Sequence, residues 1–319
     1  MKSKTASCVC SIFLAIISLP FGAVGQSGTR NVAAIALQKF YAAAQGISFP
    51  TGSAPISVVF DGSNIWVAND LGHSLTKRRA SDGALLGTFP TQAAVAAMVF
   101  DGANIWAVNP ASSSITKFRA SDGKQLGTFP AGQFPGAGLA FDGVNIWISN
   151  ADANTVTKLR ASTGAIQGTF QTGAAATGVA FDGANVWVAN FVGNSVTKLR
   201  ASDGHVLGTF PAGVRPRKLV FDGASIWVVN SGSNNVTKLR ASDGLNQGTF
   251  AVGNDPVALT FDGASIWVAN FSDNTVTRLR STDGHNLGTF PTGQQPNGVA
   301  FDGANIWVTN QTDNTVSKL

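Results

Sequence analysis

One stretch of ten residues recurs along this chain at a nearly constant interval. It reads Phe-Asp-Gly-Ala-Ser-Ile-Trp-Val-Ala-Asn over residues 261–270, and its seven copies begin at Phe60, Phe100, Phe141, Phe181, Phe221, Phe261 and Phe301. Five of the six intervals are 40 residues and one is 41, and each copy holds one of the seven tryptophans. A fixed period near 40 residues indicates a repeat architecture in which like units stack on one another. The 319 residues therefore predict one repeat domain rather than two unrelated ones.

Each repeat alternates short apolar runs with turn signals. In the fourth copy we expect strand a over residues 178–181, strand b over 186–190, strand c over 195–200 and strand d over 206–210. Asp-Gly pairs between a and b and between c and d are strong hairpin signals. Pro211 follows strand d, and proline belongs at sheet edges because it cannot donate to a ladder. Four short antiparallel strands per repeat, with d outermost, describe one blade of a β-propeller.

The two ends of the repeat array predict that the ring is closed. The last copy stops at Leu319, after its strand c, while residues 47–51 match a strand d and precede the first copy. We expect these residues to complete the last blade, because closure removes the sheet edges that an open array exposes. The sequence thus predicts an all-β, seven-bladed propeller of four-stranded antiparallel blades over residues 46–319.

The first 25 residues are typical of an export signal. Lys2 and Lys4 precede an apolar stretch over residues 9–19, and small residues at 23–25 predict cleavage before Gln26. The apolar stretch is shorter than the ~20 residues of a membrane span. Cys8 and Cys10 lie in this segment, so the mature chain would contain no cysteine. We expect a periplasmic, secreted or cell-surface monomer without a membrane span, and a short N-terminal helix over residues 29–45.

Three motifs carry a resemblance to a known kind of repeat. Trp-Val-Ala-Asn, Thr-Val-Thr-Lys-Leu-Arg and Gly-Thr-Phe-Pro-Thr-Gly resemble the YVTN/NHL-type propeller repeat of bacterial extracytoplasmic proteins, across residues 46–319. More distantly, the chain is similar to virginiamycin B lyase and gluconolactonase-like propellers. The resemblance implies a propeller fold, but such families include enzymes, binding proteins and surface proteins.

The catalytic residues that these enzyme families imply are missing. Lyase-like propellers would carry a His in a Pro-His-Gly entry to strand a, together with Glu and further His residues. The matching positions here follow Pro55, Pro216, Pro256 and Pro296 and hold no His, and the chain contains no Glu, which the gluconolactonase-like metal site also needs. We therefore predict no catalytic residue, no metal and no cofactor.

The repeated residues have structural interpretations. The tryptophans predict a ring of packing sites between blades, the alternative being an exposed ring that stacks on carbohydrate. Twelve of the seventeen aspartates stand in Asp-Gly turns, where Asp bonds its own turn backbone, and they lack the alternating oxygen ligands of a calcium loop. Basic pairs on strand c, such as Lys198 and Arg200, recur in six copies. We expect solvated charges there, with a basic binding belt as the alternative.

Charge gives no argument for nucleic-acid binding. Removal of Lys2 and Lys4 lowers the formal net charge from +5 to +3, and this excess is spread over the repeats. A nucleic-acid partner would favour a strongly basic cluster or tail, which the sequence lacks. We therefore expect no nucleic-acid partner.

Candidate site residues lie in the loops that differ between copies. The b–c and d–a loops vary in every repeat, and in a four-stranded meander both emerge on the same face. A site for one particular partner needs residues that are not repeated seven times, and such loops supply them. These departures form the candidate ligand-binding set: Arg215, Arg217, Lys218, Asp255, Phe191, Phe271 and His73.

The cations of this set predict an anion site. Lys218 replaces the small residue that other copies place where strand a enters the channel. Arg215, Arg217 and Lys218 would receive an anionic group, with Phe191 and Phe271 as an apolar wall; the alternative is a set of ordinary exposed loop residues. The sequence favours an exported, non-catalytic propeller that binds a protein, glycan or small anionic ligand. The other hypotheses are a lyase or lactonase built on the same loops, and a structural cell-surface repeat protein.

Overall fold

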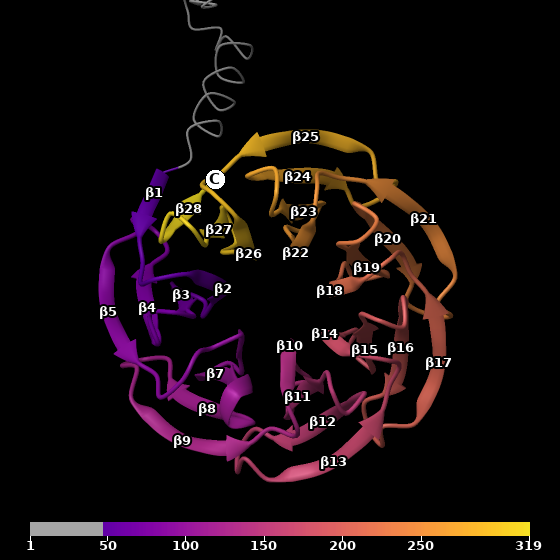
Figure 1. Ribbon diagram of the computed structural model, residues 1–319, viewed down its shortest axis with the longest axis horizontal. Coiled ribbons are helices and arrows are strands. Elements are labelled where there is room, and N and C mark those ends of the chain that lie inside the picture. Colours follow the sequence, from indigo (N-terminus) through magenta and orange to yellow (C-terminus); the bar gives the residue numbers. More distant parts are fainter. Residues whose placement is uncertain (1–46) are drawn as a thin grey trace, which may run out of the picture. The chain divides into compact units, whose positions relative to one another are not determined.

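The computed structural model describes residues 47–319, so the expected signal segment and the expected helix over residues 29–45 lie outside the described residues. Within residues 47–319 seven four-stranded antiparallel sheets stand radially around a common axis (Figure 1). This confirms the predicted all-β, seven-bladed propeller. Among these residues, no helix has the length and apolar character needed to cross a membrane.

Six blades are formed by consecutive strands. Blade 1 consists of β2 (Pro55–Phe60), β3 (Asn64–Asn69), β4 (Ser74–Arg79) and β5 (Leu85–Pro90). Blade 2 consists of β6 (Ala97–Phe100), β7 (Asn104–Asn109), β8 (Ser114–Arg119) and β9 (Gln125–Pro130), with a 3-10 turn η1 (Pro110–Ser112) between β7 and β8. Blade 3 consists of β10 (Pro135–Phe141), β11 (Asn145–Asn150), β12 (Thr155–Arg160) and β13 (Ile166–Gln171).

The same order continues through the next three blades. Blade 4 consists of β14 (Ala176–Phe181), β15 (Asn185–Asn190), β16 (Ser195–Arg200) and β17 (Val206–Pro211). Blade 5 consists of β18 (Pro216–Phe221), β19 (Ser225–Asn230), β20 (Asn235–Arg240) and β21 (Asn246–Ala251). Blade 6 consists of β22 (Pro256–Phe261), β23 (Ser265–Asn270), β24 (Thr275–Arg280) and β25 (Asn286–Pro291).

Blade 7 joins the two ends of the described chain. It consists of β26 (Pro296–Phe301), β27 (Ile306–Asn310), β28 (Thr315–Lys318) and β1 (Ile47–Pro50). β1 pairs antiparallel with β28, with Phe49 opposite Val316. The backbone amide of Thr51 extends this pairing by donating to the carbonyl of Asn314 at 2.8 Å. The predicted closure by residues 47–51 is confirmed.

The strands of blade 4 differ slightly in length from the sequence prediction. β14 begins two residues earlier than expected and β17 ends at Pro211, one residue later. Pro211 still lies on the outermost strand, where its missing N–H faces no partner strand.

The tryptophans occupy the interfaces between blades. Six are fully buried, and Trp147 of blade 3, for example, packs against Val179 and Leu199 of blade 4. Each indole N–H donates to the aspartate that lies five residues earlier, as Trp187 does to Asp182 Oδ2 at 2.8 Å. The other oxygen of that carboxylate accepts two amides of its own Asp-Gly turn. Because the indoles are buried, they cannot stack on carbohydrate. Each aspartate holds both its own hairpin turn and the indole.

The c–d turns are fitted to the preceding blade. Gly123 in the turn of blade 2 has φ +75°, a region that L side chains rarely adopt. The ring of Phe89, from blade 1, covers this glycine so closely that an added Cβ would lie 2.0 Å from it. A side chain at Gly123 would therefore strain the turn and displace the ring, which accounts for the near-constant Ala-Ser-Asp-Gly sequence.

Candidate functional site

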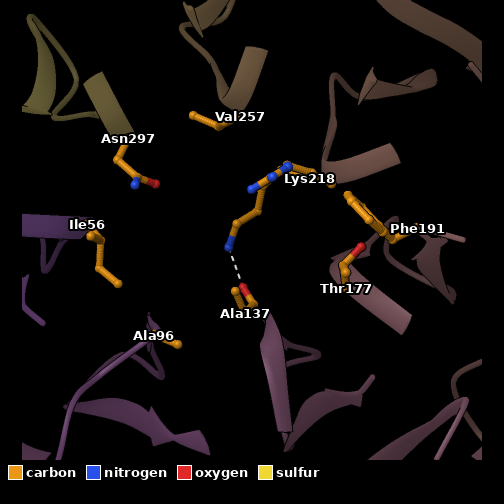
Figure 2. A pocket seen from close by; sticks show the side chains of 9 residues that line it. Ile56, Ala96, Ala137, Thr177, Phe191, Lys218, Val257 and Asn297 are labelled. Atoms are coloured by element: carbon orange, nitrogen blue, oxygen red, sulfur yellow. Dashed lines mark hydrogen bonds between the residues drawn. The ribbon is translucent and has the colours of Figure 1, made fainter. Parts of the chain in front are cut away.

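The first strands of the seven blades converge on a cavity of about 350 Å³ at the channel mouth. Its wall is built from equivalent residues at the start of strand a in the seven blades, just before β6 in blade 2, and the copies differ at this position: Ile56, Ala96, Ala137, Thr177, Arg217, Val257 and Asn297. Lys218 and Phe191 complete the lining, and Figure 2 shows the side chains around the opening. We call this space the channel-mouth cavity.

The next residue of strand a is small in six blades, because the backbones approach closely there. At Gly178, an added Cβ would lie 2.3 Å from the carbonyl oxygen of Arg217 in the neighbouring blade. Blade 5 alone places a long side chain, Lys218, at this level. A smaller cavity of about 160 Å³ is lined in part by the apolar residues one position further along strand a: Val58, Met98, Leu139, Val179, Leu219, Leu259 and Val299. Lys218 lines both cavities.

The Lys218 side chain extends across the channel. It leaves β18 of blade 5, and its Nζ donates to the backbone carbonyl of Ala137 on β10 of blade 3 (Figure 2). Burial of the ammonium group, and secondarily the positive charge of Arg217, lower the pKa of Lys218 to about 8. Both effects disfavour the charged form. A negative group entering the cavity would relieve this cost.

Two arginines of blade 5 lie over an aromatic ring of blade 4. The guanidinium carbons of Arg217 and Arg215 are 5.5 Å and 5.9 Å from the ring centroid of Phe191. The Nε of Arg217 donates to Ser231 Oγ at 3.1 Å. Arg215 has φ +56°, and its backbone N–H donates to Asn194 Oδ1 at 2.9 Å. Neighbouring blades therefore position the two cations at the rim.

The other three predicted site residues do not line the channel-mouth cavity. Asp255 occupies in blade 6 the loop position that Arg215 has in blade 5, and its carbonyl accepts the backbone N–H of Phe271. Phe271 packs on the apolar core between blades 6 and 7. His73 is exposed and has φ +43°, at the position where five other blades carry an asparagine. The structure thus brings Arg217, Lys218 and Phe191 together in the cavity, with Arg215 beside them.

Six lining residues were not among those predicted from the sequence: Ile56, Ala96, Ala137, Thr177, Val257 and Asn297. A signal for them exists in the repeat comparison. They stand one residue before the nearly uniform small position, and they differ strongly between copies. A variable position directly next to a uniformly small one therefore indicates where strand a begins to line the channel.

Within residues 47–319, no group of three or more His, Cys, Asp or Glu side chains is placed to hold a metal ion. The channel-mouth cavity is lined by two cations, two neutral polar side chains and five apolar ones, with neither a carboxylate nor an imidazole. Such a lining suits an anionic group joined to an apolar body.

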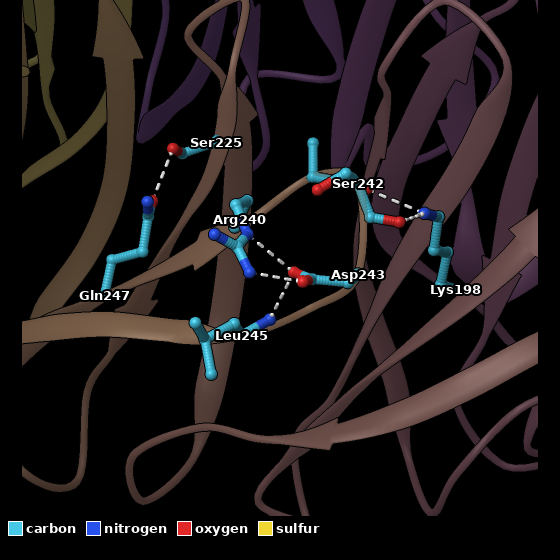
Figure 3. A network of polar contacts seen from close by, with 8 residues as sticks. Lys198, Ser225, Arg240, Ser242, Asp243, Leu245 and Gln247 are labelled. Atoms are coloured by element: carbon cyan, nitrogen blue, oxygen red, sulfur yellow. Dashed lines mark hydrogen bonds and ion pairs between the residues drawn. The ribbon is translucent and has the colours of Figure 1, made fainter.

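The basic pairs of strand c do not form a solvated belt. Lys198 is 6% exposed, and its Nζ donates to the carbonyls of Ala241 and Ser242 in the next blade, at 2.7 Å and 3.1 Å (Figure 3). It also lies 4.9 Å from the centroid of Trp187. The prediction that both members of the pair are solvated is wrong for the lysine. The face of the tryptophan and the turn carbonyls of the next blade together form a site for the ammonium group.

The second member of the pair behaves as expected. Arg200 is half exposed and forms a 2.9 Å ion pair with Asp203 of its own turn. The lysine contact recurs between successive blades, including Lys318 of blade 7, whose Nζ donates to Ala80 and Ser81 of blade 1. Because these amines are already bound, a binding belt on strand c is not supported.

Blade 6 has arginine in place of this lysine. Its neighbour, blade 7, is completed by β1 and has no c–d turn whose carbonyls could accept. Arg278 instead stays within its own blade, stacking 5.1 Å from the centroid of Trp267 and donating to Ser265 Oγ at 2.9 Å. The exception therefore follows from the closure.

Comparisons with solved structures support the fold. Hydrazine synthase from Kuenenia stuttgartiensis is 17% identical, with a TM-score of 0.74 over 84% of this chain and 96% of the other. Virginiamycin B lyase from Staphylococcus aureus is 18% identical, with a TM-score of 0.74 over 86% and 98%. A streptogramin B lyase gives 17%, 0.74, 86% and 96%. No protein-family model and no curated protein matches the sequence.

Proposed function

We propose that the protein is an exported binding protein whose channel-mouth cavity takes a small organic anion with an apolar body. The observation that carries this proposal is the pairing of Arg217 and Lys218 in a cavity whose remaining lining is apolar or neutral. At about 350 Å³ the cavity falls at the small end of ligand pockets, which favours a small molecule over a glycan or a protein segment.

The two cations have different parts in this proposal. Arg217 presents a planar fork of donors that matches a carboxylate, while Lys218 supplies a point charge deeper in the channel. Apolar atoms of the ligand would lie against Ile56 and Val257, away from the arginine stack on Phe191. A bound carboxylate would also favour the protonated form of Lys218 and raise its pKa.

The alternative is a lyase, since two of the structurally similar proteins carry that name. General acid–base catalysis usually needs a titratable group within hydrogen-bond reach of the substrate. Of the residues that line the cavity, Lys218 is the one whose pKa approaches neutrality. The binding function therefore needs fewer assumptions about this cavity than acid–base elimination does.

Isothermal titration calorimetry with 4-methylpentanoate and benzoate tests the proposal. We expect saturable binding that Arg217→Gln weakens about 10–100-fold, because a charged hydrogen bond contributes about 1.5–3 kcal/mol. Arg240→Gln is the matched control, since Arg240 pairs with Asp243 in a c–d turn. Binding of neither anion, or equal binding by both variants, would contradict the proposal.

A further inference from the structure

Lys218 differs from the other lysines of the described chain. The lysines of strand c are held by carbonyls of a neighbouring blade and by the face of their own tryptophan, as Lys198 is. Lys124 is exposed beside a turn. Lys218 instead comes from a strand a and points into a cavity with largely apolar walls (Figure 2).

The position of its neighbours leaves room for chemistry at Nζ. Gly138 and Gly178 stand at the same level of the channel and contribute no side chain. The carbonyl of Ala137 accepts a hydrogen from Nζ. A neutral amine can make the same bond with one of its two hydrogens, so its lone pair remains free to attack a carbon atom in the cavity.

The protonation equilibrium supports such an attack. Desolvation and the charge of Arg217 lower the pKa of Lys218 to about 8. At pH 8 about half of the Lys218 side chains are then neutral, against about 0.3% for a lysine of ordinary pKa. Desolvated lysines beside another cation are known amine nucleophiles toward carbonyl groups.

We propose that Lys218 forms an imine with the carbonyl carbon of a small 2-oxo acid whose carboxylate is paired with Arg217. The inference rests on the proposed anion binding and names its ligand class. Arg217 and Lys218 are consecutive residues that line the same cavity, and a 2-oxo acid carries its carboxylate and its carbonyl carbon on adjacent atoms. The apolar tail of the acid lies toward Ile56 and Val257.

The step balances without any further reagent. The lone pair of Nζ forms a bond to the carbonyl carbon, and the π electrons of the C=O bond move to oxygen. A proton passes from nitrogen to that oxygen through solvent water, giving a carbinolamine. The C–O bond then breaks, the hydroxyl leaves as water after taking a second proton from solvent, and the nitrogen lone pair forms the C=N bond of a protonated imine, which gives the neutral imine when its N–H proton returns to solvent. One molecule of water is released for each imine, and nothing is oxidised or reduced.

Reductive trapping tests the inference. The full-length protein is incubated at pH 8 with 4-methyl-2-oxopentanoate and cyanoborohydride, and peptide mass spectrometry measures the adduct at each lysine. We expect at least tenfold more adduct at Lys218 than at exposed Lys124. Lys218→Arg keeps the positive charge and loses the adduct, while its circular dichroism shows that it folds.

A second probe separates the role of Arg217. We expect Arg217→Gln to reduce trapping of 4-methyl-2-oxopentanoate at least tenfold more than it reduces trapping of 3-methylbutanal, which has no carboxylate. Equal labelling of Lys218 and Lys124, with 4-methylpentanoate still bound through Arg217, would overturn the imine and leave the binding function standing. Loss of both trapping and anion binding would overturn both proposals.

Discussion

Replacing Lys198 by methionine tests how the blades are held together. Methionine follows the lysine side chain as far as Cε and keeps the apolar contact with Trp187, but it lacks the ammonium group that donates to the carbonyls of Ala241 and Ser242. The wild-type ammonium makes two charged hydrogen bonds and lies 4.9 Å from the centroid of the indole. Gross contributions of about 1.5–3 kcal/mol per bond and up to about 2 kcal/mol for the cation–π contact oppose a desolvation cost of several kcal/mol.

The net effect of Lys198→Met follows from these opposing contributions. We expect the free energy of unfolding to fall by about 2–3 kcal/mol. The loss is no larger because the turn carbonyls that lose their donor can bond to water instead. At roughly 2–4 °C per kcal/mol for a domain of this size, the melting temperature falls by about 4–12 °C. Differential scanning calorimetry measures it. Hydrogen exchange of the turn over residues 241–244 should accelerate, because that turn loses its tie to blade 4.

Arg200→Gln is the control for this experiment. Arg200 lies two residues from Lys198 on β16, and its ion pair with Asp203 is half exposed on both sides. Exposed ion pairs contribute little to stability, so the melting temperature should change much less than it does in Lys198→Met. Equal melting temperatures for the two variants, or unchanged exchange in the 241–244 turn, would refute the assignment of the lysine as the tie between blades.

Three further predictions concern closure and pH. Deleting residues 46–52 removes β1 and should lower the melting temperature sharply; an unchanged melting curve would exclude closure. Burial alone would raise the pKa of Asp182, but hydrogen bonds from Trp187 and the turn amides hold that pKa below its usual value. The ionised carboxylate therefore stabilises the fold above pH ~4, and this stabilisation is lost as the pH falls further. Asp182→Asn should therefore cost about 1–2 kcal/mol at pH 7, and an equal cost at pH 2.5 would contradict this. The lowered pKa of Lys218 means that the unfolded chain binds more protons between pH 8 and 10.5, so wild-type stability rises over that window. Lys218→Met should be more stable than wild type at pH 7. The pKa shift sets an upper limit of about 3 kcal/mol, and partial solvation of the side chain makes the difference smaller than this limit. Calorimetry should show that the difference disappears near pH 10.5.

Repetition explains why the fold was predictable from one sequence. Seven copies of one pattern mark the same strands and turns repeatedly, so an error in one copy is corrected by the others. The match between residues 47–51 and strand d revealed the closure because Phe49 keeps the spacing that Phe210 has in blade 4. These inferences depend on local pattern and on the need to pair sheet edges.

The site was less predictable because it is defined by contacts between blades. The sequence does not distinguish Lys198 from a surface cation, since the carbonyls that bind it lie 43 and 44 residues away in the next blade. The sequence likewise does not distinguish Ile56 and Val257 from other apolar strand residues, and it is the ring arrangement that brings both to the channel-mouth cavity. Loop departures identified Arg217 and Lys218, because Lys218 is a charge at an otherwise small position and Arg217 is the one charge among the residues that precede that position.

Anomalous diffraction from a crystal soaked in 4-bromobenzoate tests the central claim, that Arg217 and Lys218 make the channel mouth an anion site. The account predicts one bromine peak in the channel-mouth cavity near Ile56 and Val257, with the carboxylate bonded to Arg217 and Lys218, and its disappearance in Arg217→Gln. Bromine bound elsewhere on the propeller with the channel-mouth cavity empty, or a peak unchanged in Arg217→Gln, would contradict the claim.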